Sequence, residues 1–176
     1  MNARERRLYA DHNKIKDEFS GHKYIRIDPI EGAPPVRYRV TYFLKGLKLD
    51  KKTKQPVESH QHEVEIYLHK SYPREKPQCT IKSDIFHPNF GPSKICIADY
   101  WAAGESLADI IIQIGQMIQY QSYNPKSPLN QEAARWTIDN ENLFPIDNID
   151  LYQAEPDVEI ISGQDEEEDD LDIEIF

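Results

Sequence analysis

The feature of this sequence that most constrains its fold is a change in hydrophobic periodicity along the chain. Apolar residues recur at helical spacing in residues 3–19, and Ser20 with Gly21 marks the end of this amphipathic helix. Alternation of apolar and polar residues then predicts four antiparallel strands, in residues 24–27, 36–49, 63–68 and 78–86. Helical spacing returns in residues 107–120, and a short helix is expected in residues 131–138. The pattern predicts an α+β fold with an N-terminal helix, a four-stranded antiparallel meander, an irregular loop, a long central helix and a short C-terminal helix.

Charge divides the chain into two parts. Residues 1–136 hold all 21 Lys and Arg with 16 of the 31 Asp and Glu, whereas residues 137–176 hold the other 15 acids and no base. We therefore expect a folded core over residues 1–138 and an acidic, mostly disordered tail over residues 139–176. No stripe of Lys and Arg with interleaved aromatic residues occurs, so nucleic acid is not an expected partner.

The sequence also bears on compartment. Its apolar runs are shorter than the roughly 18 residues of a membrane-spanning helix, and its first residues are charged, so we expect a cytoplasmic protein without a membrane partner. Because disulfides are rare in a reducing compartment, Cys79 and Cys96 are expected to be separate thiols.

The run His87-Pro88-Asn89-Phe90-Gly91-Pro92-Ser93-Lys94-Ile95-Cys96 places an amide side chain and two prolines upstream of a cysteine. This arrangement indicates a loop that holds one thiol. Read without further context, Cys96 could be an inert core thiol and Asn89 a turn cap. Cys79 lies in a strand pattern and is expected to be a small buried apolar residue.

The string YPREKPQCTIKSDIFHPN, which begins at Tyr72, resembles the YP-x-x-x-P stretch and the HPN motif of the ubiquitin-conjugating enzyme family. Downstream, ICI, Trp101, the long helix and YNPKSPLNQEAA are similar in order to that family's elements, and the resemblance covers about residues 3–137. It implies that Cys96 accepts a ubiquitin-like protein from an activating enzyme as a thioester and passes it to an amine of a target protein. It also implies no metal or cofactor, since ATP is used by the activating enzyme.

The resemblance implies further site residues. Asn89 matches the motif asparagine, which can donate to a developing oxyanion or hold the loop, and His87 matches a structural histidine that ties the loop to backbone. Ser127 stands where many members place an acid beside the incoming lysine, and Asp99 is a candidate substitute whose alternative is a solvated loop acid. The intervals around Cys96 are shorter than usual in the family, so we expect a compact gate.

Partner surfaces depart from the family in part. Arg4, Arg6 and Arg7 resemble its basic docking surface for the activating enzyme, the alternative being a solvated helix face. Arg74 replaces an aromatic residue that usually meets a RING-type ligase, so ordinary RING recognition is not expected and a ligase is an optional partner. By analogy alone, such divergence suggests a bacterial member in a defence pathway.

Two segments of the acidic tail, residues 158–161 and 171–176, alternate apolar and acidic residues. Their apolar members are Val158, Ile160, Ile161, Leu171, Ile173 and Ile175. The segments resemble SUMO-interacting motifs and predict strand addition to a ubiquitin-like protein or the activating enzyme, with folding against the basic body as the alternative. The rival function for the whole chain is a noncatalytic binding module of the same fold.

Overall fold

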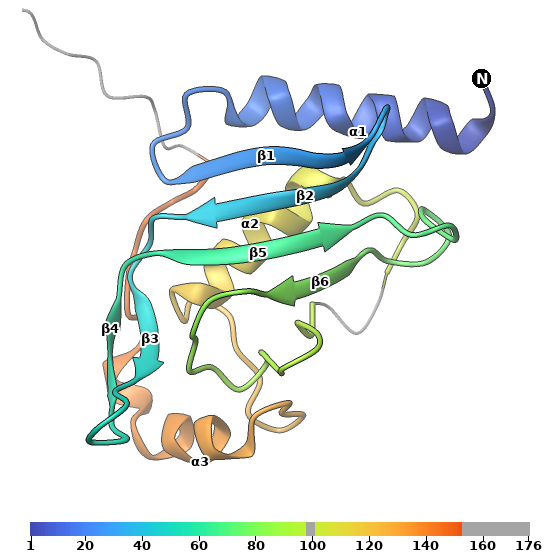
Figure 1. Ribbon diagram of the computed structural model, residues 1–176. Helices are drawn as coiled ribbons and strands as arrows, with labels where there is room; N and C mark the ends of the chain where they lie inside the picture. The colour runs from blue at the N-terminus through green and yellow to red at the C-terminus, as the bar shows by residue number, and fades with distance from the viewer. Residues whose placement is uncertain (98–100, 153–176) are drawn as a thin grey trace, which may run out of the picture.

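The computed structural model describes residues 1–97 and 101–152 (Figure 1). Its helices are α1 (Ala3–Phe19), α2 (Leu107–Ile118) and α3 (Gln131–Asp139), followed by the short 3-10 helix η1 (Glu141–Leu143). Its strands are β1 (Ile25–Gly32), β2 (Pro35–Tyr42), β3 (Gly46–Leu49), β4 (Pro56–Ser59), β5 (His62–Tyr67) and β6 (Gln78–Ile81). The expected α+β architecture is confirmed.

Four strands form an antiparallel sheet in the order β1-β2-β5-β6. Alternation turns one row of side chains into the core, and its central members Tyr38, Val40 and Ile66 are 0% exposed. α2 lies against this inner face, and α1 lies along the β1 side of the sheet (Figure 1). The buried hydroxyl of Tyr42 donates to the Ile111 carbonyl oxygen at 2.8 Å, which fixes α2 on the sheet.

The single strand expected in residues 36–49 is wrong, because the chain bends after Tyr42 and pairs elsewhere. β3 and β4 form a separate two-stranded sheet, joined by a polar turn that contains Lys51, Lys52 and Lys54. At the bend, a Cβ on Gly46 would approach both His62 Nε2 and the Ile118 carbonyl oxygen to 2.9 Å. This close contact with β5 and α2 depends on tertiary packing, which alternation alone does not reveal.

The strand expected in residues 78–86 is too long, since β6 ends at Ile81. Beyond it the chain leaves the sheet, and the Phe86 amide donates to the Leu47 carbonyl oxygen at 2.7 Å. Phe86 and Leu47 then join a second apolar cluster with Tyr120 and Ala133. This cluster packs α3 and the β3–β4 hairpin around the segment that leads to Cys96.

α2 is buried on nearly every side because it crosses the centre of the molecule. Ser106 and Asp109 form a reciprocal capping box at its N-terminus. Its buried residues are Leu107, Ala108, Ile110, Ile111, Ile112, Ile114, Gly115, Met117 and Ile118. The apolar pattern of residues 107–120 therefore predicts this helix correctly.

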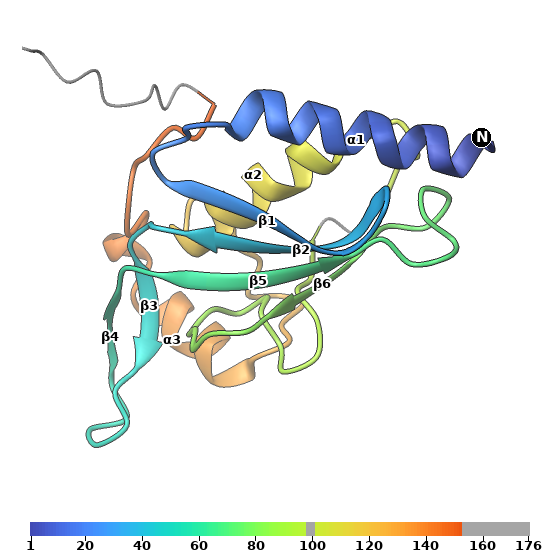
Figure 2. The ribbon, with the colours of Figure 1, turned by 45° about the horizontal axis from the view of Figure 1, so that its top comes forward.

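The folded body continues beyond residue 138, although the sequence predicts a weakly structured tail from residue 139. Leu151 is 4% exposed and lies against Gly115 of α2, a position where a Cβ would collide with the leucine. The Gln119 carbonyl and side-chain oxygens accept hydrogen bonds from the amides of Ile146 and Ile149. Figure 2 shows this segment running from α3 to the end of the sheet where β1 begins. Leu151 and the amide contacts of Gln119 extend the folded body into what charge alone assigns to the tail.

Among the described residues, no helix is both long enough and apolar enough to span a membrane.

Candidate active site

The backbone around Cys96 is fixed by hydrogen bonds to both neighbouring segments. The Cys96 amide donates to the Asn89 carbonyl oxygen at 2.9 Å, and the Ile95 amide donates to the Cys79 carbonyl oxygen of β6 at 2.9 Å. Ile95 and Ile97 are buried on either side, at 4% and 3% exposed, whereas the Cys96 side chain is partly exposed. The chain thus presents this thiol from a rigid, apolar anchor.

His87 supports this loop from beneath. It is 0% exposed and packs against Phe90 and Tyr120, with ring centroids 5.0 Å and 4.5 Å away. Its Nδ1 accepts from the Asn89 amide at 3.0 Å, which places the proton of the neutral ring on Nε2. Burial lowers the pKa of His87 to about 3, so the imidazole stays uncharged at neutral pH and serves the structure of the loop.

Tyr120 is a supporting residue that sequence reasoning missed. It follows α2 in a left-handed conformation, with φ at 57°, which is uncommon for a residue other than glycine. Its hydroxyl donates to the Phe86 carbonyl oxygen at 2.5 Å, and its ring stacks on Phe144 at 4.6 Å. Tyr120 therefore joins the end of α2 to the segment before His87. No local pattern could indicate this, since Phe86, Tyr120 and Phe144 meet only in the folded chain.

Asn89 is 4% exposed, and its side chain is occupied by the loop that follows α2. Its Nδ2 donates to the carbonyl oxygens of Asn124 at 2.9 Å and Ser127 at 3.4 Å. Its Oδ1 accepts from the Asn124 amide at 2.7 Å. Of the two roles that the resemblance implies, loop support is the one that these contacts perform.

Cys96 lies between two cavities. The smaller one, of about 140 Å³, brings Cys96 together with Asn89 and Ser127, which the sequence places up to 38 residues apart. Its other lining residues are Ile97, Gln113, Met117, Ser122, Tyr123 and Asn124. Among the described residues that line it, none is Asp, Glu, His, Lys or Arg. An amine that enters this cavity meets hydroxyl, amide and apolar groups.

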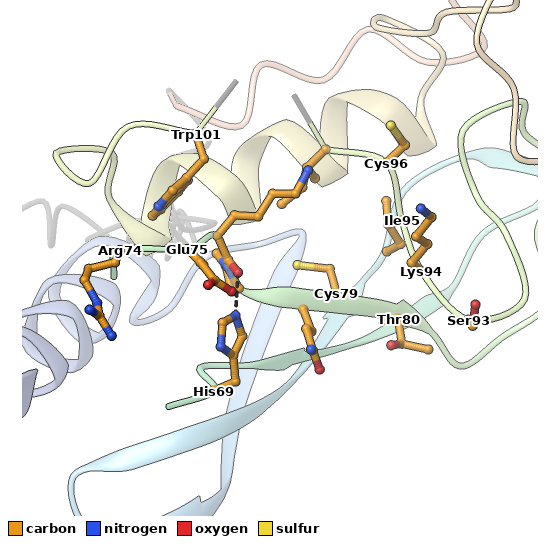
Figure 3. Close-up of a pocket in the computed structure, with 14 residues that line it drawn as sticks. His69, Arg74, Glu75, Cys79, Thr80, Ser93, Lys94, Ile95, Cys96 and Trp101 are labelled. Atoms are coloured by element: carbon orange, nitrogen blue, oxygen red, sulfur yellow. Dashed lines mark hydrogen bonds between the residues drawn. The ribbon is translucent and has the colours of Figure 1, made fainter. Parts of the chain in front are cut away.

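The larger cavity, of about 730 Å³, lies on the other side of the Cys96 segment (Figure 3). Cys79 also lines it but is 3% exposed, and burial raises the pKa of its thiol to about 12. Figure 3 shows the Cys96 sulfur directed away from Cys79, and both cysteines are free, as the sequence predicts. Cys79 is thus held as a protonated, buried side chain, and Cys96 is the more accessible of the two thiols.

The segment after Cys96 is tied to α1. Trp101 Nε1 donates to the Pro73 carbonyl oxygen at 2.8 Å. Arg7 donates to the carbonyl oxygens of Ala103 and Glu105, both at 2.5 Å, and pairs with the buried Asp11 at 2.8 Å. Although burial opposes the charge, the neighbouring Tyr72 and Asp11 keep the pKa of Arg7 raised.

These contacts bear on the expected docking surface of α1. Arg7 is engaged as above, and Arg4 donates to the carbonyl oxygens of Leu68 and His69 at 3.0 Å and 3.2 Å. Arg6 is exposed and donates to the Met1 carbonyl oxygen at 3.0 Å. Arg4 and Arg7 thus brace α1 against two loops, and Arg6 has the most accessible guanidinium of the three.

Other expected site residues fall outside the described chain. Asp99 lies in residues 98–100, and the tail segments with Val158, Ile160, Ile161, Leu171, Ile173 and Ile175 lie in residues 153–176. Within residues 1–97 and 101–152, no cluster of three or more His, Cys, Asp and Glu could hold a metal ion.

Comparison with known proteins relates this fold and site to one family. The model for the family described as ubiquitin-conjugating enzyme matches residues 45–147. The chain is 28% identical over 120 residues to "Ubiquitin-conjugating enzyme E2 13" of Saccharomyces cerevisiae, an alignment that spans 65% of this chain and 76% of that protein. It is 31% identical over 81 residues to "Ubiquitin-conjugating enzyme E2 S-A" of Xenopus laevis, spanning 44% of this chain and 35% of that protein.

Solved structures share the fold. One titled "Novel Ubiquitin-Conjugating Enzyme" matches with a TM-score of 0.57 and 22% identity, over 78% of this chain and 86% of its own. The E2 domain of a Toxoplasma gondii ubiquitin conjugating enzyme matches with a TM-score of 0.56 and 20% identity, over 80% of this chain and 90% of its own.

Proposed function

This chain belongs to the ubiquitin-conjugating enzyme family, and on that premise we propose that it carries a ubiquitin-like protein as a thioester on Cys96 and transfers it to an amine of a target. The observation that carries the proposal is the position of Cys96. The backbone around Cys96 is hydrogen-bonded to Asn89 and to Cys79. Its thiol is partly exposed and borders a cavity that Asn89 and Ser127 also line.

The proposed reaction has two displacement steps. The Cys96 thiolate attacks the carbonyl carbon of the thioester on the activating enzyme, and the tetrahedral intermediate expels that enzyme's cysteine as a thiolate. An uncharged amine of the target then attacks the new thioester, expels the Cys96 thiolate and loses a proton to leave an amide. ATP is used by the activating enzyme, and neither step requires a metal or cofactor on this chain.

The small cavity accounts for the approach of the amine. Ser127 is exposed at its edge, and its hydroxyl can accept a hydrogen bond from the incoming nitrogen. Asn89 holds the loop that contains Ser127, so it acts as a positioning residue. Asp99 stays a candidate for a second group at this gate.

For the activating enzyme, we propose that Arg6 is the accessible member of the α1 surface, because Arg4 and Arg7 are engaged within the chain. A ligase is an optional partner, since Arg74 departs from the family's aromatic contact. The setting in a bacterial defence pathway stays a prediction, which the genes beside this one would test.

The experiment is reconstitution with a cognate activating enzyme, its ubiquitin-like protein and ATP. We expect an adduct that a thiol reductant removes and that Cys96→Ala abolishes, while Cys79→Ala retains it because that thiol is buried. Cys96→Ser should give a reductant-resistant ester instead. If the adduct persists in Cys96→Ala, the nucleophile is assigned wrongly. If the wild type forms none, the rival binding module is favoured.

A further inference from the structure

The larger cavity beside Cys96 is a preformed groove. One wall is the segment from Arg74 to Thr80, and the other is the segment from Ser93 to Ile97 together with Trp101. His69 Nε2 donates to the Lys76 carbonyl oxygen at 2.8 Å, and the Ile95 amide bonds to Cys79 across the floor at 2.9 Å. These contacts fix the two walls relative to each other, so the groove of about 730 Å³ is already open in this structure.

Most of the charged side chains described around this groove are positive. Figure 3 shows Arg74 at one end, near Trp101, and Lys94 at the other end, near Ser93. Both are exposed, and neither forms an ion pair within residues 1–97 and 101–152. Lys76 adds a third cation, whereas Glu75 is the one acid among the described lining residues. Because the apolar side chains of Pro77, Ile95 and Trp101 also line the groove, it suits a segment that alternates acidic and apolar residues.

The chain itself contains such segments. Residues 153–176 carry 11 acids and no Lys or Arg, so they complement the groove in charge. Within them, residues 171–176 read Leu-Asp-Ile-Glu-Ile-Phe. In an extended conformation Leu171, Ile173 and Ile175 share one side, and Asp172 and Glu174 lie on the other side with Phe176. We propose that residues 171–176 bind in cis in the groove beside Cys96 and partly cover its thiol.

The length of chain after Tyr152 favours residues 171–176 over residues 158–161 as the segment that binds in the groove. His22 Nε2 donates to the Leu151 carbonyl oxygen at 3.0 Å, so the last described residues lie at the end of the molecule where β1 begins. Figures 1 and 2 show the segment that leads into α2 toward the opposite end. A body of this size is about 40 Å across. Residues 158–161 can extend at most about 30 Å beyond Tyr152, whereas residue 171 can extend about 60 Å. The later segment therefore reaches the groove without strain.

The main competing site on this chain is the turn of the β3–β4 hairpin, where Lys51, Lys52 and Lys54 are exposed. It projects from the body, as Figure 2 shows. Lys51, Lys52 and Lys54 line neither of the cavities beside Cys96, and a segment bound at this turn through its acids alone would leave Ile173 and Ile175 in water. The groove offers cations to the acidic residues of the tail segment and apolar side chains to its apolar residues.

A carbodiimide, which joins carboxylates to amines in contact, tests the location in the full chain. We expect intramolecular cross-links from Asp172 and Glu174 to Lys94 or Lys76, identified by mass spectrometry of the monomer. Cross-links confined to Lys51, Lys52 and Lys54 overturn the proposal, as do cross-links found only between two copies of the chain.

The rate at which iodoacetamide alkylates Cys96 tests whether the thiol is covered. The triple change Leu171→Asp, Ile173→Asp and Ile175→Asp should raise this rate, by up to about twofold if the groove is occupied half of the time. The matched change Val158→Asp, Ile160→Asp and Ile161→Asp should leave the rate unaltered. An effect of the matched change alone, or of neither, contradicts the assignment.

Charge reversal supplies the second arm. Lys94→Glu should also raise the alkylation rate by releasing the tail, although a negative charge near Cys96 would by itself slow the reaction. Lys54→Glu on the hairpin is its control and should have no effect. Lys94→Glu in the triple variant measures that direct effect of charge. Equal changes in rate with and without the triple change refute the docking, as does a faster reaction in Lys54→Glu. None of these measurements requires a thioester, so they stand apart from the test of the transferase.

Discussion

Replacing Asn89 should separate loop support from a direct part in catalysis. The side chain is 4% exposed and makes two short hydrogen bonds with Asn124, at 2.7 Å and 2.9 Å, and a weaker one with the Ser127 carbonyl at 3.4 Å. Net contributions of about 1 kcal/mol for each short bond predict that Asn89→Ala lowers the free energy of unfolding by about 2 kcal/mol. With a urea dependence near 2 kcal/mol per molar, the unfolding midpoint should fall by about 1 M.

The matched control is Asn142→Ala, whose exposed side chain should contribute less than about 0.5 kcal/mol. The Asn124 amide should also exchange its hydrogen faster in Asn89→Ala, because Oδ1 no longer accepts it. Discharge of a preformed thioester to lysine should then fall by about tenfold or less. Unaltered urea stability and amide exchange, together with a discharge at least about a hundredfold slower, would refute this reasoning and favour an oxyanion donor.

Asn89→Asp sharpens the test because it keeps an acceptor for Asn124 but points a carboxylate at two carbonyl oxygens. This contact favours the neutral carboxyl and raises its pKa in the folded state above that in the unfolded chain. The folded variant then binds a proton more readily than the unfolded chain, so its stability relative to the wild type should increase as the pH falls. Urea unfolding of both proteins at matched pH values measures this. A constant difference between pH 7 and pH 5 would contradict it.

Two further predictions concern stability. Leu151→Ala should lower the free energy of unfolding by about 2–4 kcal/mol, because the Leu151 side chain is only 4% exposed. The control Leu143→Ala should change this free energy little, because Leu143 is 49% exposed. Equal effects of the two changes in urea unfolding would contradict the packing of Leu151. Burial lowers the pKa of His87 to about 3 and of His62 to about 4, so the unfolded chain binds protons more readily between those values and about 6.5. Stability should therefore fall by roughly 3 kcal/mol from pH 7 to pH 5, and unaltered urea midpoints would show that these rings are not buried as neutral groups.

Short-range sequence patterns correctly predicted the helices and strands that depend mainly on contacts between residues close in sequence. Apolar spacing over residues 3–19 and the Ser20-Gly21 pair located both ends of α1, where Asn2 and Glu5 also form a capping box in the structure. The bend after β2 could not be found in this way, because alternation continues through residues 43–49 while the contact of Gly46 with His62 and Ile118 ends the pairing. The packing of Leu151 was missed for a similar reason, since its acidic neighbours dominate the composition of that segment.

For the candidate active site as well, the sequence predicted which residues take part but not the contacts that they make in the folded chain. The order of motifs located Cys96, Asn89 and His87, but not the engagement of Asn89 by a loop 35 residues later or the support that Tyr120 gives from the end of α2. Likewise, the family resemblance suggested a basic docking surface on α1, whereas Arg7 is held by Asp11 and by the Ala103 carbonyl oxygen. Residue type indicates what a side chain can do, and only the folded chain shows which partner occupies it.

The cavity shared by Cys96, Asn89 and Ser127 suggests how a nucleophile without an adjacent base can work. His87 is neutral and buried beneath the loop, and the described residues that line the cavity bring neither an acid nor a basic side chain to the sulfur. A lysine that enters loses part of its hydration there, which lowers its pKa and favours the uncharged amine that can attack. If Cys96 carries the proposed thioester, its buried neighbours Ile95 and Ile97 would hold that group in place for the attack. Under this proposal, selectivity for the amine rests on the shape of the cavity, so enlarging it should slow transfer more than removing any single polar group.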